Sequence, residues 1–135
     1  MPTTLLSDSI EVGIVTDNIE QMRHFYGEVL DLEYEGELPF TGGTMHRYKL
    51  GTNIIKLVSY QTMPTKSLPG GGEAGLGIRY FSFGVADLDA AVAGWQSGGA
   101  ELTVDITPFG GGVGFCFMAD PDGNWIEVFG MTTAE

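Results

Sequence analysis

The chain contains a single cysteine, Cys116, which excludes an internal disulfide and any metal site built from several cysteines. Cys116 lies between two phenylalanines in an apolar run, and a free cysteine in such a setting usually packs as a small apolar side chain. We therefore expect Cys116 in the core rather than at a reactive site.

Basic residues are also scarce, because 6 lysines and arginines stand against 18 acidic residues and give a formal net charge of -12. This charge repels the phosphates of nucleic acids and anionic lipid surfaces alike, so we expect no nucleic-acid partner. The acidity fits either a well-solvated surface or the attraction of a cationic ligand, and composition does not separate the two.

Long apolar runs are absent too: none approaches the roughly 18 residues that a membrane span needs. The N-terminal residues carry no basic stretch that leads into an apolar segment, so we expect neither membrane association nor secretion, and a cytoplasmic location. A hydrophobic content of 43% in 135 residues suits a single domain over residues 1–135.

What the sequence does contain is an internal repeat. Residues 11–26 recur as residues 80–95, and residues 51–58 recur as residues 122–129. Two copies of one supersecondary unit usually pack about a pseudo-twofold axis, where equivalent positions approach one another. A site near that axis would use Glu11, Lys56, Tyr80 and Glu127.

Hydrophobic periodicity and turn residues predict the order βαβββ in both copies, and hence an α+β fold of two modules. The first module is expected over about residues 8–60, and its second strand over residues 32–35. The second module is expected over about residues 78–131. Residues 61–77 are rich in glycine and proline and are predicted to form a flexible linker without packing of its own.

Three segments resemble the vicinal oxygen chelate superfamily, also called the glyoxalase/bleomycin resistance protein/extradiol dioxygenase fold: EVGIVTDNIEQMRHFYGEVLDLEYEGE, GIRYFSFGVADLDAAVAGW and FMADPDGNWIEVFG. The resemblance spans nearly the whole chain. It implies that the modules curl a mixed sheet around a cavity. Metal-dependent members of the family place ligands on the first and last strands of each module, which are the four positions reached from the repeat.

The chain departs from that family pattern at two of the four positions. Metal-dependent members carry His, Gln or Glu there, which Glu11 and Glu127 match and Lys56 and Tyr80 do not. An ammonium has no lone pair and repels a divalent cation, and a phenol with a pKa near about 10 is a poor ligand. We therefore expect no cofactor; one divalent metal ion held by Glu11, Glu127 and His46 stays open as the alternative.

The same four side chains can carry out proton transfer without a metal. Glu127 is the expected base, Tyr80 the donor to a developing oxyanion, and Lys56 the cation that stabilises an enolate or fixes a carboxylate. An ion pair of Lys56 with Glu11 or Glu127 that merely fills the place of a metal is the structural alternative.

Further residues on the same strands are candidates for substrate contacts. Strand alternation puts Trp125 and Phe129 on one face with Glu127, and two arginines flank the same strands, where one can hold an anionic group. The expected substrate-binding residues are His46, Arg47, Arg79, Trp125 and Phe129.

Three functions follow as hypotheses. The first is a metal-independent isomerase, epimerase, lyase or cyclase that acts on a small carbonyl or phenolic molecule. The second is a metal-dependent enzyme of the glyoxalase or dioxygenase type, and the third is a non-catalytic drug-binding protein similar to bleomycin resistance proteins. The expected partners are a small-molecule ligand and a second copy of the chain in a homodimer, with modules pairing either within or between chains.

Overall fold

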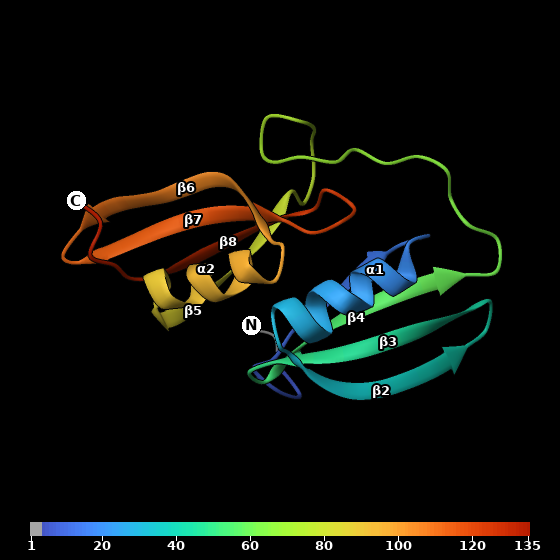
Figure 1. Ribbon diagram of the computed structural model, residues 1–135. Coiled ribbons are helices and arrows are strands. Elements are labelled where there is room, and N and C mark those ends of the chain that lie inside the picture. The colour runs from blue at the N-terminus through green and yellow to red at the C-terminus, as the bar shows by residue number, and fades with distance from the viewer. Residues whose placement is uncertain (1–3) are drawn as a thin grey trace.

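The computed structural model describes residues 4–135, which form two βαβββ modules in succession (Figure 1). In module 1 the elements are β1 (Glu11–Val15), α1 (Ile19–His24), the π-helical turn η1 (Phe25–Val29), β2 (Glu33–Phe40), β3 (Gly43–Leu50) and β4 (Asn53–Tyr60). In module 2 they are β5 (Tyr80–Asp87), α2 (Leu88–Ser97), β6 (Glu101–Gly110), β7 (Val113–Ala119) and β8 (Trp125–Met131). None of the helices in residues 4–135 has the length and hydropathy to cross a membrane.

Each module forms one mixed sheet, and over residues 4–135 the two sheets have the strand orders β1-β4-β3-β2 and β5-β8-β7-β6. The first strand of each module pairs in parallel with the last, and the remaining pairs are antiparallel. Gly13 lies opposite Lys56 in module 1 as Ser82 lies opposite Glu127 in module 2. The registers are therefore equivalent, as the sequence repeat predicts. The predicted two-module α+β fold is confirmed, with two separate sheets rather than a closed barrel across the described strands.

Strand β2 is longer than the predicted strand over residues 32–35, since it runs to Phe40. Gly36 and Pro39 are poor strand formers, and for that reason they indicated an earlier end. A bulge between Tyr34 and Gly36 absorbs the irregular backbone. Pro39 is tolerated because β2 is an edge strand, where a missing N–H need not cost a sheet hydrogen bond.

Both modules share one hydrophobic core, which lies on the faces of the sheets that the helices cover. Alternate residues of β4 and β8, such as Leu57 and Val128, are fully buried there together with Met22 of α1. Cys116 is also fully buried in this core, which confirms its predicted packing role. We call the opposite face of each sheet, turned away from its helix, the open face.

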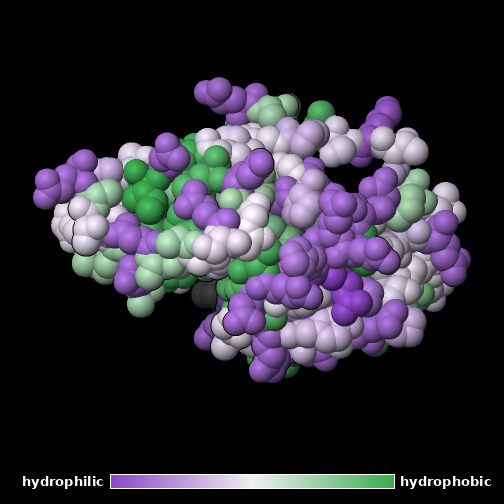
Figure 2. Space-filling model, viewed as in Figure 1, coloured by the Kyte–Doolittle hydropathy of each residue, from purple (hydrophilic) through white to green (hydrophobic). Residues whose placement is uncertain are grey.

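In Figure 2 the surface of module 1 is hydrophilic over α1, whereas apolar residues reach the surface of module 2 over β6 and β7.

A buried hydrogen bond joins the two modules inside this core. The hydroxyl of Tyr26 in η1 donates to Oδ2 of Asp120, at the turn between β7 and β8, over 2.7 Å. Asn124 and the backbone N–H groups of Asp122 and Asn124 also donate to Asp120, so the carboxylate is well satisfied. Burial and the nearby Asp120 raise the pKa of Tyr26 well above its usual value, which keeps the donor protonated.

The linker over residues 61–77 differs from its prediction because part of it is packed against module 2. Gly70 forms a bridge with Asn124, and its N–H donates to the carbonyl of Gly123 over 3.0 Å. Gly123 has a φ of 88° and lies against Pro69, where a side chain would not fit. The linker has no helix or strand of its own, but it is held in place.

We predict that Tyr26→Phe lowers the free energy of unfolding by roughly 1–3 kcal/mol, because it removes one buried donor to Asp120. Urea denaturation followed by circular dichroism measures the change. The matched control is Tyr34→Phe, which removes an exposed hydroxyl and is expected to change stability by no more than about 0.5 kcal/mol. Equal stability of Tyr26→Phe and the wild type would contradict the role of this bond.

Candidate functional site

The two modules border a cleft of about 560 Å³ that lies between their first strands, β1 and β5, both of which are edge strands. Glu11 and Tyr80, the first residues of these strands, line this cleft together with Trp125. The structure thus brings two of the four candidate catalytic residues to one hollow. Lys56 and Glu127 lie one strand further in, on the open faces of modules 1 and 2 respectively.

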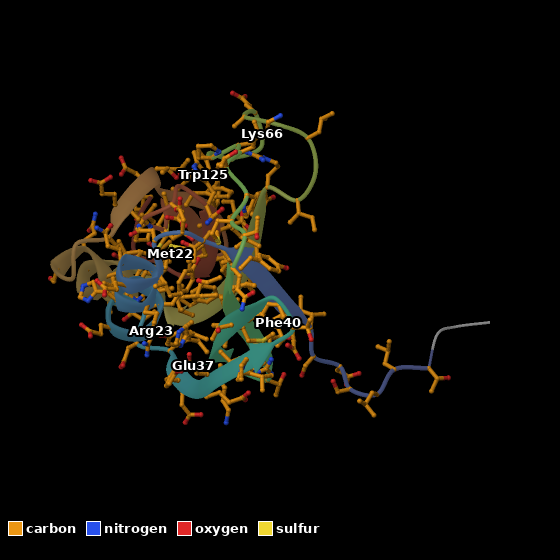
Figure 3. All side chains as sticks on the ribbon, turned by 90° about the vertical axis from the view of Figure 1, so that its right-hand side faces the viewer. Met22, Arg23, Glu37, Phe40, Lys66 and Trp125 are labelled. Atoms are coloured by element: carbon orange, nitrogen blue, oxygen red, sulfur yellow. The ribbon has the colours of Figure 1, made fainter. Side chains whose placement is uncertain are left out.

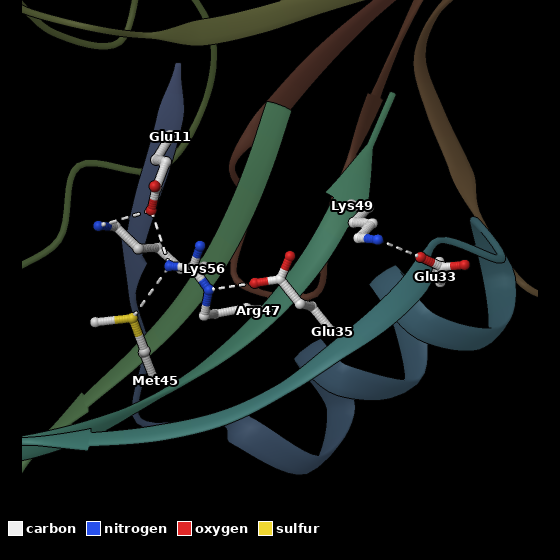
Figure 4. A network of polar contacts seen from close by, with 7 residues as sticks. All are labelled: Glu11, Glu33, Glu35, Met45, Arg47, Lys49 and Lys56. Carbon is white, nitrogen blue, oxygen red and sulfur yellow. Dashed lines mark hydrogen bonds and ion pairs between the residues drawn. The ribbon is translucent and has the colours of Figure 1, made fainter. Parts of the chain in front are cut away.

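The open face of module 1 carries a network of ion pairs (Figure 4). Arg47 of β3 donates from Nη1 to Glu11 over 2.9 Å and from Nε to Glu35 over 2.7 Å. Nζ of Lys56 lies 3.3 Å from the same oxygen of Glu11. We call these four residues, Glu11, Glu35, Arg47 and Lys56, the charged cluster.

Every cation of the charged cluster is paired with a carboxylate, and the pairing affects Glu11 in turn. The hydrogen bond from Arg47 holds the pKa of Glu11 below its usual value; Lys56 adds to this effect, and partial burial opposes it. Glu11 is therefore ionised at neutral pH and is poorly suited to accept a proton in catalysis.

The donor set of module 1 does not fit a divalent metal ion. The Lys56 ammonium occupies a family ligand position and contacts Glu11, the carboxylate that would be its fellow ligand. His46 lies on the helix-covered face, where its Nδ1 is 3.0 Å from the hydroxyl of Tyr34. Within residues 4–135 no three His, Cys, Asp or Glu side chains are grouped so that they could hold a metal, so Glu11, Glu127 and His46 do not come together in the chain.

The open face of module 2 is aromatic rather than charged. Phe117 lies at the centre, with its ring centroid 5.1 Å from that of Tyr80 and 5.4 Å from that of Trp125. We call the connected set the aromatic row; its members are Tyr80, Phe109, Phe115, Phe117 and Trp125.

Glu127 shares the open face with the aromatic row, because it is paired in register with Phe117. Its Oε1 accepts a hydrogen bond of 2.7 Å from the hydroxyl of Ser82. Across the described residues no lysine, arginine or histidine forms an ion pair with Glu127. The exposed Phe129 follows Glu127 on the same face, as strand alternation predicts.

Phe115 and Phe117 were missed as site residues from the sequence. A signal was available, since a strand that buries Cys116 must turn its two neighbours to the opposite face. Burial, with a smaller contribution from the charge of Glu127, raises the pKa of Cys116 to about 11, so this thiol is no nucleophile at neutral pH.

The two arginines expected to contact substrate have different surroundings. Arg47 lies in the charged cluster on the open face. Arg79 instead donates to the carbonyls of Leu68, Gly70 and Gly71 in the linker, so its guanidinium is engaged by backbone.

The profile of the Glyoxalase/Bleomycin resistance protein/Dioxygenase superfamily matches residues 9–128, and the chain therefore belongs to this superfamily. The Escherichia coli K12 protein YaeR, described as uncharacterized, is 28% identical over 122 residues, which cover 87% of this chain and 92% of that protein.

Solved structures show the same fold. A glyoxalase family protein from Bacillus cereus superposes with a TM-score of 0.80 at 21% identity and covers 96% of both chains. TnmS3, an antibiotic binding protein from Streptomyces sp. CB03234, superposes with a TM-score of 0.70 at 22% identity and covers 96% of this chain and 100% of its own. The family resemblance predicted from the three sequence segments is confirmed.

We predict that Arg47→Met raises the pKa of Glu11 towards its usual value, because the hydrogen bond from Arg47 is the largest cause of its depression. Lys56→Met removes a weaker contact and is expected to raise it less. Carbon-13 NMR titration of the glutamate carboxyl groups measures both variants. A larger shift in Lys56→Met than in Arg47→Met would show that the ammonium, not the guanidinium, controls Glu11.

The pKa of Glu11 is lower in the folded chain than in the unfolded chain. The ion pairs of Glu11 therefore stabilise the fold fully when the pH is above the pKa of the unfolded chain. This contribution is lost as the pH falls through the pKa of the folded chain. The group is substantially exposed, so the wild type should lose no more than about 1 kcal/mol over that range from this source.

Proposed function

We propose that this protein is a metal-independent enzyme that transfers a proton within a small carbonyl or phenolic molecule, with Glu127 as the base. One observation carries the proposal: Glu127 has only a serine hydroxyl as a hydrogen-bonding side chain and lies among aromatic rings, whereas Glu11 is bound by two cations. Of the two glutamates at the family ligand positions, Glu127 is the one that is free to accept a proton.

The proposed step needs no cofactor. Glu127 takes a proton from the carbon next to a carbonyl. The electron pair of that C–H bond forms a C=C bond, and the π pair of the C=O bond moves to the oxygen. The hydroxyl of Tyr80, two residues before Ser82 on β5, donates a hydrogen bond to the oxyanion. In a substrate with a β,γ-double bond, Glu127 then returns the proton on the same face to the γ carbon. The carbonyl re-forms and the double bond shifts into conjugation with it, so the product is an isomer of the substrate.

The aromatic row supports a planar or unsaturated substrate. Tyr80 and Trp125 both line the cleft between β1 and β5 and both contact Phe117. Aromatic walls supply apolar contact area and exclude water from the reacting atoms. Phe129 extends this wall beyond Glu127.

We predict that Glu127→Gln lowers the rate of the reaction by roughly 100-fold or more, because an amide does not accept the proton. The measurement is proton NMR of deuterium uptake from D2O into a panel of small ketones, aldehydes and phenols, with protein dialysed against EDTA. Glu37→Gln is the matched control, since Glu37 pairs with His46 in register, away from Glu127, and its rate should match the wild type.

Exchange by Glu127→Gln at the wild-type rate would remove Glu127 as the base. Loss of exchange after EDTA treatment, with recovery on adding a divalent metal, would support the metal-dependent alternative.

Sequestration of an aromatic compound is the second candidate function. The continuous aromatic row favours it, as does the likeness of the fold to the antibiotic binding protein TnmS3. In an acidic chain with an unpaired carboxylate on this face, a cationic aromatic compound is the best-matched ligand. Recovery of a bound compound with unchanged mass, and no deuterium uptake, would select this function over catalysis.

We further propose that two copies form a homodimer in which the open face of module 1 in one copy packs opposite the open face of module 2 in the other. Both open faces carry exposed apolar side chains, which are Val15, Leu38 and Tyr60 in module 1 and Phe109, Phe129 and Met131 in module 2. Such a pairing would cover these side chains and would place a charged cluster across from an aromatic row.

We predict that the wild type sediments as a dimer and that Leu38→Asp, a substitution on the open face of module 1, shifts it to a monomer. The control is Leu76→Asp, which adds the same charge to an exposed linker residue and should leave the dimer intact. Analytical ultracentrifugation distinguishes the species. A monomeric wild type would contradict the proposed assembly.

A further inference from the structure

The linker passes directly over Trp125, the residue through which the aromatic row reaches the cleft. In Figure 3 Trp125 lies to one side of the loop that carries Lys66 and below it. Gly71 is the contact point, because a Cβ atom built on it would lie under 3.0 Å from three atoms of the indole. The indole also neighbours Phe117, at 5.4 Å between ring centroids. Trp125 thus contacts both the backbone of the linker and an aromatic ring.

Arg79 fastens this part of the linker to the start of β5. Its Nη2 donates to the carbonyl of Leu68 over 2.7 Å and to that of Gly70 over 3.3 Å, and its Nε donates to the carbonyl of Gly71 over 3.1 Å. A planar guanidinium can donate hydrogen bonds to several carbonyl oxygens at once. Arg79 also lines the cleft beside Tyr80, so the fastening lies at the edge of the candidate site.

We propose that residues 68–75 form a strap that positions Trp125, with Gly71 and Arg79 as positioning residues for the ligand site. The inference rests on the proposed function only in taking Trp125 as part of that site. The absence of a side chain at residue 71 lets the strap lie flat on the indole. Any larger residue there would collide with the indole and would lift the strap or displace Trp125, and so change the shape of the site.

The two adjacent glycines provide a direct comparison. A Cβ on Gly72 would meet nothing within 4 Å, whereas one on Gly71 would collide with Trp125. Neither glycine has a φ in the left-handed region, so alanine adds no backbone strain at either position. Gly71→Ala therefore places a methyl group against the indole of Trp125, whereas Gly72→Ala places one in open space.

The experiment follows Trp125 by its fluorescence in a Trp95→Phe background, where it is the remaining tryptophan. We expect Gly71→Ala to shift the emission of Trp125 and to raise its quenching by acrylamide, while Gly72→Ala matches the parent. Thermal unfolding is recorded alongside. A Gly71→Ala variant with lower thermal stability but an unchanged Trp125 spectrum and quenching would overturn the proposal, because it would assign Gly71 a structural role alone.

Arg79→Met removes the hydrogen bonds between Arg79 and the linker, and its effect is measured by the fluorescence quenching of Trp125. The control is Lys66→Met, which removes the same charge from an exposed linker residue. We expect acrylamide quenching of Trp125 to rise in Arg79→Met and to stay unchanged in Lys66→Met. Equal quenching in both variants and the parent would overturn the role of Arg79. Neither measurement requires a ligand, so the result is independent of whether the deuterium-uptake experiment succeeds.

Discussion

The shared core beneath the helices is the constraint on which the rest of this structure depends. Strand residues alternate between two faces, so burial of Leu57 and Val128 against the helices forces Lys56 and Glu127 to the open faces. The buried bond between Tyr26 and Asp120 then joins the modules across this core. Packing in the shared core thereby places Lys56 and Glu127 on the open faces of their modules.

The two copies of the repeat have the same backbone arrangement but carry different kinds of side chain on their open faces. The registers of β1 with β4 and of β5 with β8 are equivalent, yet the first face carries ion pairs and the second carries aromatic rings. The two faces therefore differ in chemistry, one being charged and the other aromatic. Only the second face holds a carboxylate without a cationic partner in the described chain, which is why we assign the chemistry to Glu127.

Lys56 lies at a position that is equivalent to a metal-ligand position of the family, but its side chain has a different role. It lies on the last strand of module 1, where metal-dependent members of the superfamily carry a ligand, but it contacts Glu11 as a cation. Arg47 adds a second positive charge to the same carboxylate. In a chain with so few basic residues, two cations at one glutamate make this face a neutralised surface.

The sequence by itself determined the repeat, the βαβββ order, the family and the four candidate positions, because periodicity and spacing are local properties of the chain. It also identified Cys116 as buried, although the implication that Phe117 must then face the site was not drawn. Strand alternation placed Trp125 and Phe129 beside Glu127 in the same way.

Only the tertiary structure decided which charged groups meet. Arg47 bonds to Glu11 and Glu35, His46 turns to the helix-covered face, and Arg79 bonds to the linker. Each outcome depends on strand register, a bulge in β2 or the path of a loop. Such contacts join residues far apart in the chain, and a one-residue change of register would reverse the face of each side chain, so residue type alone does not fix them.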